Sequence, residues 1–282
     1  MKRLQLTYRL KKIVLTAVQY IGFAILLVLF IIPFVWMVST SVKSIGETLT
    51  NPPIFIPSEF HFENYVKAWK SGPFLHFFLN SAIITFSSMI LQLLFVVPAA
   101  YAFARCKFRG KTILFGITMM TLMIPGQLIF MPLFLIFSKM GLINSYVSMI
   151  LPFSTSAFGI FMLRQSFMQI PEELLEAARL DQASEWQIIR HIMVPMARPT
   201  IVTLMLLTFI SRWNDYFWPL VMTTNDKVRT LSIGVSMLKN TEGGASWNVL
   251  MAGNVILVLP ILIVFVCAQR QIIRAFTYTG EK

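Results

Sequence analysis

The segment PEELLEAARLDQASEWQIIRHIMVPMARP at residues 171–199 is polar and helix-forming in a chain whose other long segments are apolar. Pro171 suits the first position of a helix, and the glutamates after it suit the positive end of the helix dipole. Ser184 and Gln187 have the spacing of a capping box, which predicts a second helix from Ser184. A helix of about ten residues is roughly 15 Å long, too short for a bilayer core of roughly 30 Å. The segment therefore predicts two short helices on a membrane surface, where a soluble partner can meet them.

The apolar stripes of the two helices are expected at Leu174 and Ala178, and at Trp186, Ile189 and Met193. The prolines at the end of the segment are expected to end or redirect the chain.

Composition places the chain among membrane proteins. Of its 282 residues, 56% are hydrophobic and 13% are charged, whereas soluble domains carry about 25% charged residues. Cys106 and Cys267 are far apart and give no disulfide framework, and the three histidines show no metal-ligand spacing. We therefore expect a polytopic membrane protein without a metal site.

Six apolar runs predict an all-α fold with six transmembrane helices. They cover about residues 13–38, 77–104, 113–137, 146–163, 200–222 and 249–268. The first run is longer than the roughly 7–15 residues of a signal-peptide core, so we expect a retained helix. Pro125 and Pro132 predict kinks in the third.

The basic residues indicate how the chain is oriented. Six spans place both termini on one side, and that side carries sixteen lysines and arginines against seven on the other. The excess predicts cytoplasmic termini and a cytoplasmic segment 171–199. The net charge of +12 is thus a topology signal and gives no reason to expect nucleic acid.

The sequence shows no recognisable catalytic or nucleotide-binding motif. It has no GxxxxGK[ST] phosphate loop, and no nucleophile and base at recognisable spacing, so no catalytic residue is expected. Arg212 and Asp215 are the main ionisable residues within the predicted spans. An ion-coupled carrier would be expected to bury more such groups along a relay. If the chain moves a solute uphill, its energy must come from a partner.

Several runs along the chain match a known pattern. The run EAARLDQA at residues 176–183, followed by IMVP at residues 192–195, resembles the EAA loop of permease subunits from binding-protein-dependent ABC importers, with its spacing kept. Gln182 stands where glycine is usual, and Val194 stands where leucine is usual. The stretches FLNSAI at 78–83, AAYAFARCKFRGK at 99–111 and WNDYFWPL at 213–220 are similar to the smaller permease subunit of maltose-type carbohydrate importers.

The resemblance implies a type I ABC importer permease fold in a bacterial plasma membrane. Residues 1–75 would hold the basic tail, first span and extracytoplasmic loop. Residues 76–269 would form the permease domain, with a coupling loop at about 171–199, and residues 270–282 a cytoplasmic tail. The implied partners are a second permease, a cytoplasmic ATPase dimer that binds ATP and Mg, an extracytoplasmic solute-binding protein, a small-molecule sugar and membrane lipid. The chain itself would hold no cofactor.

The same resemblance assigns roles to residues. The positions that carry ATPase coupling would be Glu176, Ala177, Ala178, Asp181, Gln182 and Pro195. Glycine adopts a positive φ at low cost, whereas glutamine does so at a higher cost. The capping box at Ser184 nevertheless predicts that the break between the two short helices is kept, within a residue or two of Gln182.

Four further positions are candidates for the translocation path or a subunit contact: Asn80, Trp213, Asn214 and Asp215. For Trp213 to Asp215 an interfacial aromatic belt with a capped helix end is the other interpretation, and for Asn80 a hydrogen bond to a neighbouring helix. The alternatives for function are an ABC permease for another solute, such as a polyamine or glycerol phosphate, an ion-coupled secondary carrier, and a membrane scaffold.

Overall fold

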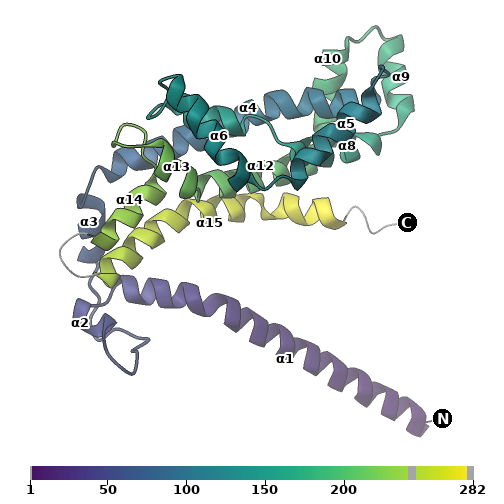
Figure 1. Ribbon diagram of the computed structural model, residues 1–282. Helices are drawn as coiled ribbons and strands as arrows, with labels where there is room; N and C mark the ends of the chain where they lie inside the picture. The colour runs from purple at the N-terminus through teal and green to yellow at the C-terminus, as the bar shows by residue number, and fades with distance from the viewer. Residues whose placement is uncertain (1, 241–245, 278–282) are drawn as a thin grey trace. The chain divides into compact units, whose positions relative to one another are not determined.

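The computed structural model describes residues 2–240 and 246–277 (Figure 1), and every regular element in these ranges is helical. The chain divides into two compact units. Unit 1 comprises Met1–Ser71 and Met237–Ile256, and unit 2 comprises Gly72–Ser236 and Leu257–Lys282. The expectation of an all-α chain is confirmed.

Three helices are long and apolar enough to cross a membrane: α1 (Lys2–Ser41), α4 (Phe74–Arg105) and α15 (Trp247–Thr277). Three bent pairs qualify when each pair is taken together. The first joins α5 (Lys111–Met120) and η1 (Thr121–Met123) to α6 (Gly126–Lys139) at 98°. The second joins α7 (Tyr146–Ile150) and η2 (Leu151–Phe153) to α8 (Ala157–Met168) at 41°. The third joins α10 (Glu185–Ile188), η3 (Ile189–Met193) and α11 (Val194–Met196) to α12 (Arg198–Trp213) at 80°.

The described residues therefore contain three to six candidate spans, and six is the number when each bent pair is one span. The orientation of the termini stays a prediction.

The third run breaks where the sequence predicted a kink. Ile124 is extended, with φ −85° and ψ 115°, and Pro125 precedes the first residue of α6. Proline disfavours helical geometry in the residue before it, which explains the break. Pro132 lies inside α6 without ending it.

The prediction of one fifth span over 200–222 is wrong. Helix α12 ends at Trp213, and a separate short helix, α13 (Phe217–Met222), follows. A carboxylate oxygen of Asp215 accepts a hydrogen bond from the backbone N–H of Trp218 at 3.2 Å, which gives a partner to an N–H in the first turn of α13 and favours a new helix. At the chain's ends, the basic tail begins α1 at Lys2, and α15 continues beyond residue 269 to Thr277.

Unit 1 is held together by buried polar groups around the end of α1. Asn64, on α3 (Glu63–Lys70), is 1% exposed and donates to the carbonyls of Ser41 at 3.0 Å and Lys43 at 2.9 Å. Asn248, at the start of α15, donates to the carbonyl of Lys43 and to the side-chain oxygen of Asn64, both at 3.2 Å. These bonds join α1, α3 and α15 within the unit.

Glu47, on α2 (Ile45–Thr48), ties the loop after α1 together. Its carboxylate accepts the backbone N–H of Ser58 at 2.8 Å and that of Ser44 at 3.2 Å. These hydrogen bonds, the Ser58 bond first, lower the pKa of Glu47 to about 2. Because the pKa is lower in the folded loop than in the free chain, the bonds stabilise the loop above pH of about 4.5, and the stabilisation disappears as the pH falls towards 2.

We expect Glu47→Gln to open this loop at neutral pH. Hydrogen–deuterium exchange of a peptide covering residues 44–58 should show protection in the wild type that is constant between pH 7 and 5 and declines at lower pH. The variant should lack that protection already at pH 7. Glu59→Gln removes a neighbouring carboxylate that makes no hydrogen bond among the described residues, and should keep wild-type protection. Equal exchange in wild type and Glu47→Gln at pH 7 would contradict the expectation.

The core of unit 2 joins α4, α8 and α12 to the segment 171–199. Its fully buried members include Val96 and Ala100 of α4, Leu163 and Phe167 of α8, and Leu204 of α12. Short helix α14 (Leu231–Met237) approaches α4 closely, because a Cβ on Gly234 would lie 2.5 Å from the ring of Phe77. Figure 1 shows α9 (Glu172–Leu180) and α10 together at one end of this unit.

Candidate coupling site

The turn after α9 keeps the geometry that glycine would give, although Gln182 occupies it. Gln182 has φ 57°, in the left-handed region. Its backbone N–H donates to the carbonyl of Arg179, and that of Ala183 donates to the carbonyl of Ala178, both at 3.0 Å. This pair of bonds is a Schellman motif, which satisfies the last carbonyls of the helix. The prediction that the break survives without glycine is confirmed, and it lies at residue 182 itself.

We expect Gln182→Gly to stabilise unit 2. A non-glycine residue in the left-handed region costs roughly 1 kcal/mol, and glycine removes that cost. Chemical unfolding in mixed micelles should show the gain. Gln169 provides the control, because it is also exposed and caps a helix end but has φ −80°. Gln169→Gly should be neutral or destabilising. A stabilisation of similar size in both variants would argue against strain at Gln182.

The second helix begins as the sequence predicted. Ser184 accepts the backbone N–H of Gln187 at 3.3 Å, and the Gln187 side chain accepts the backbone N–H of Ser184 at 2.7 Å, so the capping box is complete. A π-helical turn over Ile189–Met193 follows, and the chain is redirected by 80° on entering α12. Pro195 lies in α11 and is exposed, and Pro199 lies in the first turn of α12.

The buried face of the segment differs in part from the predicted stripes. Leu175, Ile188, Ile189 and Met193 are at most 6% exposed and join the core of unit 2. Ala178 packs against the same core. Leu174 and Trp186, which were expected in the stripes, are 44% and 57% exposed instead. Their neighbours fill the interior because the register of each short helix is set by its cap and by the core it meets.

A chain of charged side chains fixes both helices to α4. Arg105 contacts Glu172 at 2.5 Å, Glu172 contacts Arg179 at 3.5 Å, and Arg179 contacts Glu185 at 3.3 Å. The Tyr101 hydroxyl donates to Glu185. The hydrogen bond to Glu185 is the main reason that the pKa of Arg179 is raised. The start of α9, its end and the start of α10 are thus each tied to the next and to α4.

Arg105 also completes the end of another helix. Its guanidinium donates to the carbonyl of Phe167 at 2.8 Å and to that of Ile170, at the carboxyl end of α8. The side chain is 11% exposed. A helix end leaves carbonyls without intrahelical donors, and a buried cation satisfies them and suits the helix dipole.

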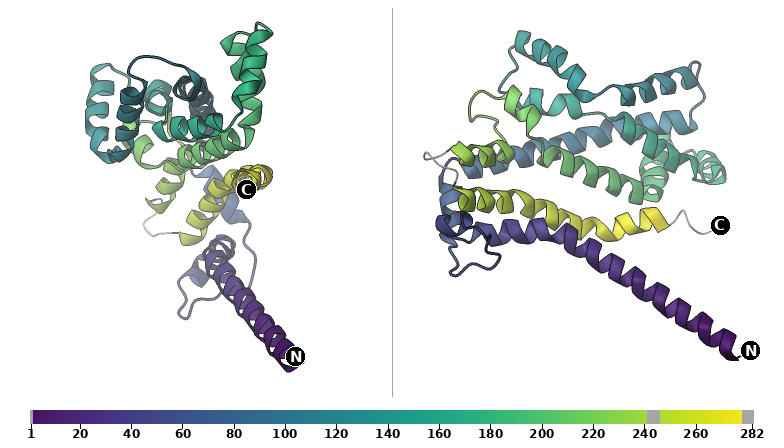
Figure 2. Two further views of the ribbon diagram at one scale, coloured as in Figure 1. Left: turned by 90° about the vertical axis from the view of Figure 1, so that its right-hand side faces the viewer. Right: turned by 60° about the horizontal axis from the view of Figure 1, so that its bottom comes forward.

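The opposite face of the segment is open. Glu176, Ala177 and Asp181 are exposed, and Leu180 is 84% exposed. Two acidic side chains, one small residue and one large apolar residue therefore share a surface on a helix whose other face is anchored. Figure 2 shows α9 and α10 at the edge of unit 2 in both further views.

Asn80 is used inside unit 2. It is 1% exposed, donates to the carbonyl of Arg229 at 2.9 Å and accepts from the hydroxyl of Tyr146 at 2.6 Å. These bonds hold the loop before α14 against α4, which favours the interpretation of Asn80 as an intramolecular contact.

The side chains of residues 213–215 lie in three different environments. Trp213 is 2% exposed, donates to the carbonyl of Leu257 at 2.9 Å and stacks on Phe209, so it packs within unit 2. Asn214 is exposed. Asp215 contacts Arg212 at 3.0 Å.

The sequence did not reveal the anchoring residues Tyr101, Arg105, Arg179 and Glu185. The charges at 172, 179 and 185 are visible in the sequence, but Arg105 lies 67 residues before Glu172 and Tyr101 lies 84 residues before Glu185. No helical periodicity relates positions so far apart.

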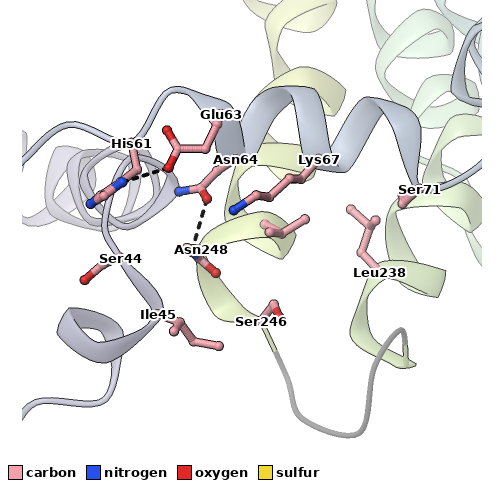
Figure 3. A pocket seen from close by; sticks show the side chains of 11 residues that line it. Ser44, Ile45, His61, Glu63, Asn64, Lys67, Ser71, Leu238, Ser246 and Asn248 are labelled. Atoms are coloured by element: carbon pink, nitrogen blue, oxygen red, sulfur yellow. Dashed lines mark hydrogen bonds and ion pairs between the residues drawn. The ribbon is translucent and has the colours of Figure 1, made fainter.

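A hollow of about 520 Å³ lies in unit 1 (Figure 3). His61 bonds to Glu63 at 2.8 Å on one side of it, Asn248 lies beside Asn64, and Lys67 extends from α3 over it. Within the described residues, no group of three His, Cys, Asp or Glu side chains could hold a metal ion.

Known proteins are similar to this chain in sequence and fold. The family model "Binding-protein-dependent transport system inner membrane component" matches residues 95–278. The arabinooligosaccharides transport system permease protein AraQ of Halalkalibacterium halodurans is 32% identical over 265 residues, which cover 93% of this chain and 95% of AraQ. The sn-glycerol-3-phosphate transport system permease protein UgpE of Salmonella typhi is 31% identical over 230 residues, which cover 79% of this chain and 82% of UgpE.

A chain in the crystal structure of a bacterial ABC transporter involved in importing the acidic polysaccharide alginate has a TM-score of 0.80. It is 25% identical, and the match covers 91% of this chain and 96% of that one.

The family model spans well over half of the chain, and AraQ matches nearly all of it. The chain is accordingly a multi-pass inner-membrane transport subunit, not an enzyme, and its family carries no cofactor. It belongs to the family of inner membrane components of binding-protein-dependent transport systems.

Proposed function

We propose that this chain is one of two permease subunits of an ATP-driven importer for a sugar or oligosaccharide. It translocates the solute by alternating access and is coupled through α9 to a cytoplasmic ATPase dimer, which binds ATP and Mg. The observation that carries the proposal is the open face of α9 on a helix fixed to α4 by buried side chains and ion pairs.

The open face suits a protein partner. Leu180, Leu174 and Trp186 are exposed large apolar residues of this segment, and clusters of such residues are typical of interaction sites. Glu176 and Asp181 offer carboxylates beside them, and Ala177 permits close approach of the partner. The anchored face is equally important, because a movement of α9 is transmitted to α4 only if rigid contacts join the two helices.

The sugar assignment is supported by AraQ, whose name records arabinooligosaccharide transport. Glycerol phosphate is the second candidate because UgpE is named for sn-glycerol-3-phosphate transport at nearly the same identity. In the predicted topology, the loop of unit 1 and the hollow in Figure 3 face the extracytoplasmic side, where a solute-binding protein would dock. The second permease would complete the path.

Cross-linking tests the coupling role directly. In a background with Cys106→Ala and Cys267→Ala, Ala177→Cys should cross-link to the ATPase in the assembled complex. Lys139→Cys, on an exposed residue at the end of α6, should not, since the predicted topology places it on the other side of the membrane. Cross-linking at Lys139 but not at Ala177 would overturn both the docking site and the topology.

Uptake by proteoliposomes separates the remaining functions. The complete complex should accumulate an arabinooligosaccharide only with ATP inside and binding protein outside. Uptake by this chain alone on an ion gradient would identify an ion-coupled carrier. ATPase activity that no solute stimulates in any assembled complex would favour a scaffold.

A further inference from the structure

A second cavity, of about 250 Å³, lies in unit 2 between α4, α12 and the turn that precedes α8. The lining residues that matter are Gln92, Phe153, Phe158, Thr208, Ser211 and Arg212. At 1.5 Å per residue, Gln92 lies about 20 Å from the Arg105 end of α4 and about 27 Å from the Phe74 end. The cavity therefore opens within the membrane-spanning part of the fold.

Gln92 brings an unused hydrogen-bond donor to this cavity. The side chain is 5% exposed, and its amide oxygen accepts from the Thr208 hydroxyl at 2.6 Å. Its amide nitrogen has two N–H groups, and neither has an acceptor among the described residues. Because this nitrogen keeps some exposure to the cavity, a ligand or water molecule can accept from it.

The charge in the cavity is already neutralised. Arg212 donates to Asp215 at 3.0 Å and to the hydroxyl of Ser211 at 3.1 Å, and its guanidinium lies 3.5 Å from the centre of the Phe153 ring. The other lining residues are uncharged. An anion entering here would lose its hydration without gaining a free counter-charge, which is strongly unfavourable.

We propose that this cavity holds one ring of a neutral saccharide during translocation and disfavours anionic solutes. Sugar hydroxyls both accept and donate, so they can pair with the Gln92 amide and the Ser211 hydroxyl. Phe158 is 45% exposed and offers an apolar surface to the C–H face of the ring. The volume is below the roughly 300–1,000 Å³ of complete small-molecule sites, which suits a subsite for part of an oligosaccharide. This inference rests on the proposed permease function and narrows its substrate class.

Thiol labelling tests occupancy of the cavity. In the background without native cysteines, Ser211→Cys places a thiol at an exposed lining position. The assembled complex is labelled with a methanethiosulfonate reagent during turnover. The probes are three neutral saccharides, arabinotriose, lactose and maltotriose, and two anions, sn-glycerol 3-phosphate and an alginate trisaccharide. An imported neutral saccharide should slow labelling, and the anions should not.

Substitution of Gln92 tests the contact. Gln92→Met keeps the size of the side chain and removes the donor. The Thr208 hydroxyl has a single hydrogen, and in this variant it can donate that hydrogen to the carbonyl of Leu204, 2.9 Å away. With saturating binding protein, uptake should slow by roughly threefold to tenfold, as expected for loss of one hydrogen bond. Thr203→Val, on the same α12 but outside the cavity, should leave uptake unchanged, and equal yields of assembled complex verify folding.

The outcomes separate this inference from the proposed function. If a neutral saccharide is imported, yet the Ser211→Cys thiol is never protected and Gln92→Met transports normally, the cavity assignment is wrong and the permease proposal stands. If only the anionic probes are imported, both the neutral selectivity and the sugar assignment are overturned.

Discussion

Replacing Arg105 with alanine is expected to destabilise unit 2 by about 3 kcal/mol and to abolish solute-dependent ATPase stimulation. The guanidinium is 11% exposed and serves two carbonyls at the end of α8 as well as Glu172 at the start of α9. Hydrogen bonds to charged groups contribute about 1.5–3 kcal/mol each, and the substitution removes two of them at the end of α8, although the carbonyl of Phe167 keeps the backbone N–H of Ile170 at 3.3 Å. Chemical unfolding in mixed micelles and ATPase assays of the assembled complex measure the two effects.

Glu172→Gln is the matched control for Arg105→Ala. The Glu172 carboxylate is 48% exposed, and exposed ion pairs contribute at most about 1 kcal/mol. The control should therefore stay close to the wild type in stability. If Glu172→Gln were as damaging as Arg105→Ala, the ion pair and not the capping of α8 would hold the segment in place.

The adjacent leucines of α9 should separate anchoring from docking. Leu175 is fully buried in the core, so Leu175→Ala should cost about 2–5 kcal/mol of stability. Leu174 is 44% exposed, so Leu174→Ala should change stability by less than about 0.5 kcal/mol. If α9 docks on the ATPase, Leu174→Ala should nevertheless weaken ATPase binding by roughly fivefold or more.

The two substitutions are compared by unfolding of the isolated chain and by affinity of the ATPase for the membrane-embedded complex. Leu174→Ala with normal ATPase affinity and a large loss of stability would contradict the prediction. That result would show that Leu174 belongs to the core of this chain and not to the docking face.

The sequence predicted the helical class and the apolar runs because both depend on local composition. A run of apolar residues long enough for a bilayer is visible without knowing its neighbours. The capping box at Ser184 was equally visible, because both of its hydrogen bonds lie within four residues. The sequence did not show whether the helices kink or break at Pro125 and at residues 214–216. Proline and polar residues permit both, and the packing of the helices decides between them.

For the candidate coupling site, too, the sequence revealed one part and the tertiary structure another. The order of residues 176–183 pointed to the segment that we propose as the coupling element, and the family to which the chain belongs supports that proposal. Tertiary structure alone decided which face of α9 is open, because Leu175 and not Leu174 meets the core.

Sequence by itself determined the class of the protein, the existence of the two short helices and the turn between them, since hydropathy, caps and helix length act over a few neighbouring residues. Only the tertiary structure decided that Arg105 and Tyr101 anchor these helices and that Gln92 lines the cavity in unit 2. Those contacts join residues from distant parts of the chain, and they form only after the helices have packed.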